Sequence, residues 1–246
     1  MPTVFDHVAI ATDKIANAPD FLVGELGGMS GYGGPSGDFT WWHWDYAGGG
    51  RIEIIEPDGP PGGFVHRYLE RLGPGIHHVN FEVDSLKETA TLAEQLGFDV
   101  VGYDDSHEYW KEAFLHPKSA MGIVVQLVES SHHDHEHEEW DHSNMAPPAE
   151  PTDAPAAVTV VGLRMRTASR DAALRLWGEL LNGRHAETPD GLAFRWPSSS
   201  MRVAVTIEDG TADEAVAIEV GADRKLRLPA GRHPVLGTQF LQVEAS

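Results

Sequence analysis

The sequence predicts an α+β protein made of paired βαβββ modules, followed by a third, degenerate module of the same kind. Two strand-like segments, TVFDHVAIAT and GIHHVNFEV, resemble each other, and each precedes a helix-like segment and further strands. A weaker copy begins at VTVVGLRMRT. One structural plan therefore occurs about three times along the chain.

The first module is predicted from a strand, a helix and a hairpin, over residues 3–12, 18–28, 38–46 and 51–57. Alternation of apolar and polar residues indicates the strands. Pro19 is tolerated in the first turn of a helix, and Gly27 is a suitable stop for it. Glycines 48–50 favour a tight turn between the two hairpin strands.

A connecting helix at 62–73 leads to the second module, whose elements are predicted at 75–83, 85–97, 98–103, 112–117 and 122–130. The third module is predicted at 158–167, 169–183, 191–196, 201–209, 214–220 and 238–244. Between these modules, residues 131–156 are rich first in His, Asp and Glu and then in Pro and Ala, which is typical of a linker. The predicted domains are therefore 1–130 and 157–246, joined by 131–156.

Composition limits the classes of function. The chain has 246 residues, no cysteine and a formal net charge of -20. A strongly negative protein repels nucleic acid and anionic membranes, so we expect neither as a partner. The sequence contains no apolar run long enough to span a membrane and no secretion signal. Together with the absence of cysteine, this favours a cytoplasmic protein.

The two histidines of GIHHVNFEV cannot both point into one site, because successive side chains on a strand face opposite sides. Val8 and Ile10 are expected to pack on helices, which places His7 on the other face of its strand. The same parity places His78 on the corresponding face of the second module and His77 on the helix side or the rim. His7 and His78 are therefore the candidate functional histidines.

The last strand of each of these modules obeys the same rule. Ile52 and Ile54 fit the helix face and leave Glu53 on the opposite one, and in the second module Gln126 is the polar residue on that face. Burying such groups without partners costs about 2 kcal/mol or more. A divalent ion held by His7, Glu53, His78 and Gln126 would satisfy all four, and this ligand set suits Zn, Co, Ni, Mn or Fe.

The stretches DHVAIAT, IEIIEP, GPGIHHVNFEVDSL and AFLHPKSAMGIVVQL resemble the vicinal oxygen chelate superfamily, which includes glyoxalase I, bleomycin-resistance proteins, extradiol dioxygenases and methylmalonyl-CoA epimerase. The motifs are most similar to those of the epimerase. The resemblance implies a cupped sheet around a metal, with His7, Glu53, His78 and Gln126 as ligands, and a homodimer. Compared with the epimerase, the acid and the amide have exchanged modules.

Isomerases of this superfamily remove a proton next to a carbonyl, which requires a base within reach. The epimerase-like acid is absent from the segment before the tryptophans, where Asp38 is the only acid. Glu53, acting both as ligand and as base, and Glu112 are therefore the candidate catalytic residues.

Three residues are candidates for substrate binding. If the hairpin loop has four residues, Trp44 pairs across from Glu53, and Trp42 points into the cup while His43 points away. Trp42 and Trp44 would then form an aromatic wall. Lys118, in LHPKSA, could meet a phosphate or carboxylate of the substrate.

The sequence therefore predicts an enzyme, a metal-dependent isomerase or lyase acting on a small carbonyl or acyl-CoA substrate. An Fe(II) dioxygenase and a non-catalytic ligand-sequestering protein are the alternatives. The third module cannot repeat the metal site, because Gly162 stands where His7 stands and Val205 stands near the place of Glu53. This module could cover the first sheet, pair across a dimer, or be a decayed copy.

Overall fold

The computed structural model describes residues 3–131 and 145–244. The chain divides into two compact units of three segments each. Unit 1 comprises Met1–Asp6, His78–Glu139 and Gly162–Val216, and unit 2 comprises His7–His77, Trp140–Val161 and Ala217–Ser246. Each unit therefore takes residues from both sides of the predicted linker. The domain boundaries predicted at 130 and 157 stay predictions.

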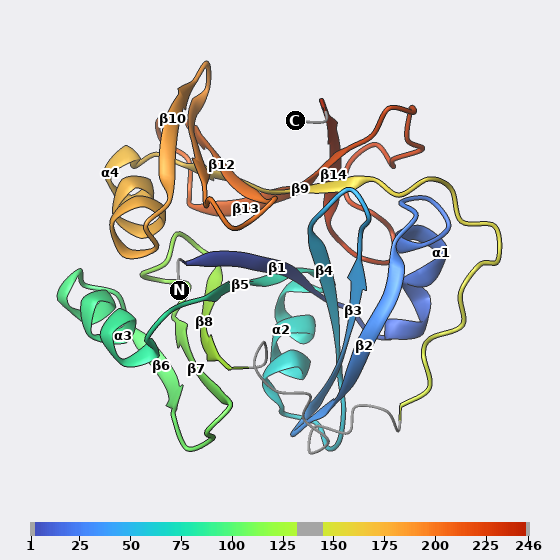
Figure 1. Ribbon diagram of the computed structural model, residues 1–246, viewed down its shortest axis with the longest axis horizontal. Coiled ribbons are helices and arrows are strands. Elements are labelled where there is room, and N and C mark those ends of the chain that lie inside the picture. The colour runs from blue at the N-terminus through green and yellow to red at the C-terminus, as the bar shows by residue number, and fades with distance from the viewer. Residues whose placement is uncertain (1–2, 132–144, 245–246) are drawn as a thin grey trace. The chain divides into compact units, whose positions relative to one another are not determined.

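The elements follow one another as coloured in Figure 1. The first module consists of β1 (Val4–Ala11), a short 3-10 helix η1 (Ile15–Asn17), α1 (Pro19–Leu22), β2 (Met29–Ser36), β3 (Phe39–Asp45) and β4 (Arg51–Pro57). Helix α2 (Phe64–Leu72) leads to the second module, which consists of β5 (Gly75–Glu82), α3 (Leu86–Gln95), β6 (Val100–Asp104), β7 (Trp110–Leu115) and β8 (Val124–Ser130).

The third module consists of β9 (Thr159–Thr167), the helix α4 (Arg170–Ala173) with its π-helical continuation η4 (Leu174–Leu180), β10 (Arg184–Thr188), β11 (Gly191–Arg195) and β12 (Arg202–Ile207). The last two strands are β13 (Glu214–Gly221) and β14 (Gln239–Val243), which pair in parallel. Among the described residues, no helix has the length and apolar character needed to cross a membrane.

The three modules share one strand order, in which the first strand lies beside the last. The orders are β2-β3-β4-β1, β5-β8-β7-β6 and β10-β11-β12-β9. In every module the first and last strands are parallel, and the other pairs are antiparallel. This repeated topology confirms the predicted α+β class and the βαβββ modules.

Two strands were not predicted, and one helix is shorter than predicted. Strand β2 is rich in glycine, a residue depleted in strands. At Gly33 a Cβ atom would lie only 2.1 Å from the backbone oxygen of Trp41, so close pairing with β3 requires glycine there. Strand β10, RHAET, is exposed throughout and lacks an apolar face.

Because β10 supplies a strand, β9 to β12 have the βαβββ order without β13 and β14, and the predicted extent of the third module, 157–246, stays a prediction. Helix α1 ends at Leu22 rather than near Gly27. The chain continues in wider turns, in which the Leu26 amide donates to the Phe21 carbonyl at 3.0 Å.

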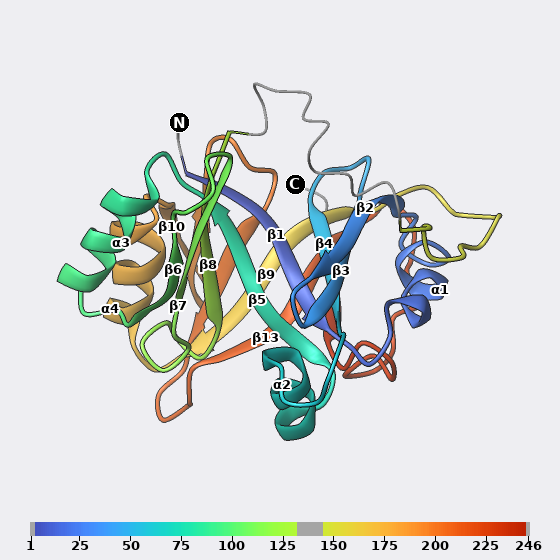
Figure 2. The same cartoon turned by 90° about the horizontal axis from the view of Figure 1, so that it is seen from below.

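In unit 1 the apolar face of β5 packs against the third module. Phe81 stacks on Phe5 with ring centroids 4.7 Å apart and meets the edge of Trp196 at 4.8 Å. Trp177 of η4 lies 6.0 Å from Phe81. Helices α3 and α4 lie side by side (Figure 2). Aromatic side chains of the third module therefore pack directly against Phe81 of β5.

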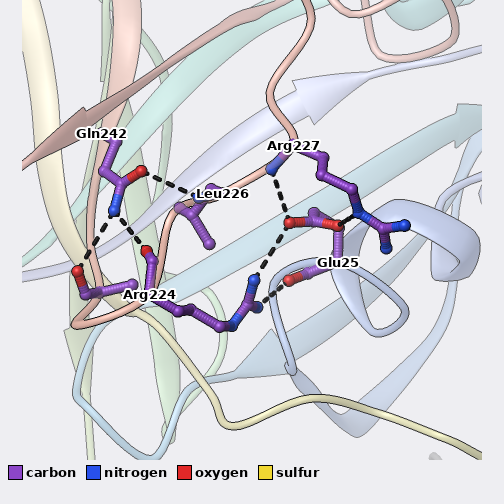
Figure 3. A network of polar contacts seen from close by, with 6 residues as sticks. Glu25, Arg224, Leu226, Arg227 and Gln242 are labelled. Carbon is purple, nitrogen blue, oxygen red and sulfur yellow. Dashed lines mark hydrogen bonds and ion pairs between the residues drawn. The ribbon is translucent and has the colours of Figure 1, made fainter.

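In unit 2 the segment after β13 is fastened to the end of α1 through Glu25, whose side chain is 8% exposed (Figure 3). The Arg227 amide and Nε donate to its two carboxylate oxygens, each at 2.8 Å. Arg224 Nη1 donates to Oε1 at 3.1 Å, and Arg224 Nη2 donates to the Glu25 backbone oxygen. Gln242 ties the same segment to β14 by accepting from Leu226 and donating to Arg224.

Candidate metal centre

Three buried side chains of unit 2 converge on one face of the first module. His7 of β1, His43 of β3 and Glu53 of β4 are 4%, 5% and 7% exposed. One potential ligand atom from each lies within 4.8 Å of the others. His43 and Glu53 are register partners across β3 and β4, and Glu53 is also the partner of Ala9 on β1. Because partners share a face and side chains alternate, all three point to the same side of the sheet.

The contacts within this group are short. His43 Nε2 lies 2.9 Å from Glu53 Oε2, within hydrogen-bond distance, and His7 Nε2 lies 3.8 Å from the same oxygen. The rings of His7 and His43 have their centroids 4.9 Å apart. A buried carboxylate needs charged or hydrogen-bonding partners. Two imidazoles and one carboxylate at this spacing are a donor set that fits Zn, Fe or Mn.

The hairpin register differs from the prediction by one residue. The loop between β3 and β4 contains Tyr46 as well as residues 47–50, so His43, not Trp44, lies opposite Glu53. A shift of one residue moves every side chain of a strand to the other face. The prediction that His43 points away from Glu53 is therefore wrong.

The same shift corrects the predicted aromatic wall. Trp42 and Trp44 pair with Ile54 and Ile52, on the face opposite Glu53. Both tryptophans are buried, and their indole nitrogens donate to Ser30 and Glu150 respectively. These placements remove the geometric basis for contact with a substrate on the face of Glu53.

Tyr32 and Trp41 occupy the place foreseen for those tryptophans. The ring of Trp41 lies 4.9 Å from that of His43, and the edge-on ring of Tyr32 lies 5.3 Å from it. Farther along this face, Trp41 packs with Ala11 and Ile55. Figure 1 shows α2, which contributes to the same apolar cluster, alongside β4. The group of His7, His43 and Glu53 thus adjoins an aromatic and apolar surface.

His78 and Gln126 lie in unit 1, on the face of the second module that the sequence predicts. Asn80, two residues after His78, is the register partner of Gln126, so all three share a face. The Asn80 amide donates to Gln126 Oε1 at 2.9 Å, and Gln126 Nε2 donates to Glu112 at 2.8 Å. Glu112 also accepts from the Trp110 indole at 3.2 Å.

The structure thus brings His7 together with Glu53, and Gln126 together with Glu112. The two pairs belong to different units. A joint site of His7, Glu53, His78 and Gln126 stays a prediction. His43, Tyr32 and Trp41 were missed, and the length of the β3–β4 loop is the feature that would have revealed them.

His77 packs on Phe64 and Tyr68 of α2 with ring centroids 5.5 and 4.8 Å away. Burial lowers the pKa of His77 to about 4, so this ring is neutral near pH 7.

Lys118 lines an open hollow of about 640 Å³ together with His116, Phe98 and Val101. Its role in substrate binding stays a prediction.

Replacing Gln126 by leucine tests whether this amide is structural. Asn80 is 1% exposed and would lose its acceptor, so we expect a loss of about 1–3 kcal/mol in the free energy of unfolding. Replacing both residues by leucine should restore much of it. Chemical denaturation of both variants without metal measures this coupling. If the double variant is no more stable than Gln126→Leu, the bond contributes nothing.

Of the predicted linker 131–156, the structure describes residue 131 and residues 145–156. Its His- and acid-rich part lies mostly in 132–144, outside the described residues. Glu150 accepts from the Trp44 indole at 3.0 Å, and the Val158 amide donates to Leu26 at 2.9 Å. The described part of this segment is therefore bonded to unit 2.

The matching family model covers parts of the first two modules. A family model described as Glyoxalase/Bleomycin resistance protein/Dioxygenase superfamily matches residues 6–114. The uncharacterized protein YqjC of Bacillus subtilis (strain 168) is 34% identical over 98 residues, which cover 37% of this chain and 67% of YqjC.

Two solved structures are among those similar to this chain. A mutant of 4-hydroxymandelate synthase from Streptomyces coelicolor has a TM-score of 0.59 at 13% identity, covering 91% of this chain and 72% of its own. Methylmalonyl-CoA epimerase from Mycobacterium tuberculosis has a TM-score of 0.47 at 22% identity, covering 52% of this chain and 87% of its own. The first supports one fold along nearly the whole chain.

Proposed function

Because the chain belongs to the glyoxalase/bleomycin resistance protein/dioxygenase superfamily, we propose that it is a metal-dependent isomerase or lyase that moves a proton next to the carbonyl of a small substrate. The observation that carries the proposal is the buried group of His7, His43 and Glu53. The expected substrates are small carbonyl compounds or acyl-CoA thioesters.

In this proposal His7, His43 and Glu53 hold a divalent ion. Such an ion supplies a Lewis acid that stabilises negative charge developing on a carbonyl oxygen. Tyr32 and Trp41 orient the apolar part of the substrate, since their rings adjoin His43. His78 and Gln126 remain proposed as further ligands, and the metal content of their variants tests this.

Of the two predicted acid–base residues, Glu53 belongs to the group itself and is the proposed proton carrier. Glu112 accepts hydrogen bonds from Gln126 and Trp110, which suits a residue that positions Gln126. Proton transfer by a positioned carboxylate contributes typically about 10²- to 10⁴-fold to rate.

Elemental analysis coupled to deuterium exchange tests the proposal. Protein prepared without chelators should contain a divalent metal and should exchange solvent deuterium into the carbon next to the carbonyl of an acyl-CoA or α-keto acid. Glu53→Gln should lose the exchange, whereas Glu70→Gln, a change at an exposed glutamate of α2, should retain it. Metal-loaded protein that catalyses no exchange with either substrate class would contradict the proposal.

An Fe(II) dioxygenase is the second candidate, and the donor set favours it. Two histidines and one carboxylate are the ligands that non-haem Fe(II) oxygenases use. Oxygen uptake by Fe(II)-loaded protein in the presence of substrate would select this class. Ligand binding without any metal would instead favour the non-catalytic sequestering protein. The homodimer and the cytoplasmic location stay predictions.

A further inference from the structure

The third module carries a concentration of arginine on one sheet face that the proposed function does not use. Arg184 of β10, Arg195 of β11 and Arg202 of β12 are consecutive register partners. They therefore stand in one row across three strands and on one face. We call these three residues the arginine row.

Two more arginines, Arg164 and Arg166 of β9, share this face, because they are register partners of Ala204 and Thr206, which follow Arg202 at intervals of two residues. The face thus holds five of the 18 lysines and arginines of a chain whose net charge is -20. Arginine is therefore concentrated on this face, although the net charge of the whole chain is negative.

The arginines border a floor of small side chains. The residues next to the row, on successive strands, are Ala186, Ala193 and Ala204. Beyond them lie Gly191 and Thr206, and Arg164 Nη1 donates to the Thr206 hydroxyl at 3.4 Å. At Gly162, beside Arg202, φ is +135° and a Cβ atom would lie 1.9 Å from the Arg202 oxygen, so no side chain fits there. The side chains that border the arginines on this face are therefore small.

Like charges placed directly opposite each other in a sheet destabilise it. Among the described residues, Arg184 and Arg195 make no ion pair, and both are exposed. The acid of β10, Glu187, lies on the other face and pairs with Arg170. Arg166 differs, since Glu214 lies 2.7 Å from its guanidinium. Arg184 and Arg195 therefore present positive charge that a bound anion would relieve.

We propose that this face binds a small molecule through a diphosphate group. Neighbouring strands lie about 4.8 Å apart, so the guanidinium forks of the row can reach the oxygens of two linked phosphates. Guanidinium binds phosphate in a bidentate manner. A compact anion is favoured over a nucleic acid. Salt screens a small ligand from the repulsion of acidic side chains more than about 8 Å away. A long polyanion, by contrast, extends over the negatively charged surface of the protein and is repelled by it. This site does not depend on the proposed metal chemistry.

Calorimetric titration with inorganic pyrophosphate tests the site, using the full chain, its Arg184→Gln/Arg195→Gln variant and a matched Arg170→Gln control. Arg170 is near β10 but pairs on the opposite face. Wild type should bind, and the double variant should bind at least about tenfold more weakly, the loss expected for charge-assisted hydrogen bonds. The control should bind like wild type.

Thermal melting separates binding from folding. Arg184 and Arg195 are exposed, so the melting temperature of the double variant should not fall. Absence of wild-type binding up to about 10 mM pyrophosphate, or equal weakening in the Arg170→Gln control, would overturn the site. Displacement of pyrophosphate by a single-stranded oligonucleotide that binds more tightly would overturn the small-molecule assignment and favour a nucleic acid.

Discussion

Replacing Glu53 by glutamine is expected to remove most of the bound divalent metal and nearly all metal-dependent activity. Glutamine preserves the shape of the side chain but removes the negative charge that two buried imidazoles share. Loss of a residue that only supports a ligand weakens metal binding by about 10- to 100-fold, and loss of a direct ligand should exceed this. Elemental analysis after dialysis measures the effect.

His43 distinguishes the structure-based site from the sequence-based one. The sequence places His43 on the other face, whereas the structure places its Nε2 atom 2.9 Å from Glu53 Oε2. His43→Ala should therefore reduce metal content as strongly as His7→Ala. His185→Ala, at an exposed histidine of β10, is the matched control and should leave the content unchanged.

The metal content of these variants can also contradict the structure-based site. Full metal content in both His43→Ala and Glu53→Gln would show that the ion sits elsewhere. Loss in His7→Ala and His78→Ala but not in His43→Ala would instead restore the four-residue site of the sequence prediction. Calorimetry of each variant without metal establishes that the protein remains folded.

The modules were predictable because their buried strands alternate strictly. Val8 and Ile10, like Ile52 and Ile54, fixed which face of each strand is apolar, and the structure agrees at every one of these positions. Glu53 was recognisable as a site residue for this reason. The alternation of side chains within a strand does not depend on the loops. It therefore predicts the face of each residue wherever a strand has one apolar face.

What failed depended on loop length and on edge strands. Because the β3–β4 loop includes Tyr46, the side chains of Trp42, His43 and Trp44 lie on the faces opposite to those predicted. The hydrophobic pattern of FTWWHWD could not reveal this, because this strand has aromatic residues on both faces. Strands β2 and β10 carry glycine or charge instead of an apolar face. Edge strands of this kind give no periodic pattern to detect.

Contacts between distant segments were also beyond the sequence. Glu25 looks like an ordinary surface acid of an amphipathic segment, yet it is buried against residues about 200 positions later. Nothing in local periodicity links α1 to the segment after β13. The stability of unit 2 therefore includes a long-range polar contact.

Replacing both Arg224 and Arg227 by alanine is expected to cost more stability than replacing Glu25 by glutamine. The Glu25 side chain is 8% exposed, and the double change leaves its carboxylate without its two guanidinium partners. We expect this to lower the free energy of unfolding by about 3 kcal/mol. Glu25→Gln should cost about 1–2 kcal/mol, because the Arg227 side chain is 85% exposed and is easily hydrated. Urea denaturation compares the two variants at pH 7.

The pH dependence gives this prediction a second, independent readout. Burial alone raises the pKa of Glu25, but hydrogen bonds from Arg227 and Arg224 outweigh burial and hold the pKa below its ordinary value of 4.5. A lowered pKa stabilises the folded protein above the unfolded-state value, and this stabilisation is lost as the pH falls through the folded-state value. The difference between wild type and the double variant should thus shrink below about pH 4.5. If the difference is the same at pH 7 and in acid, the arginines act through packing and not through the Glu25 carboxylate.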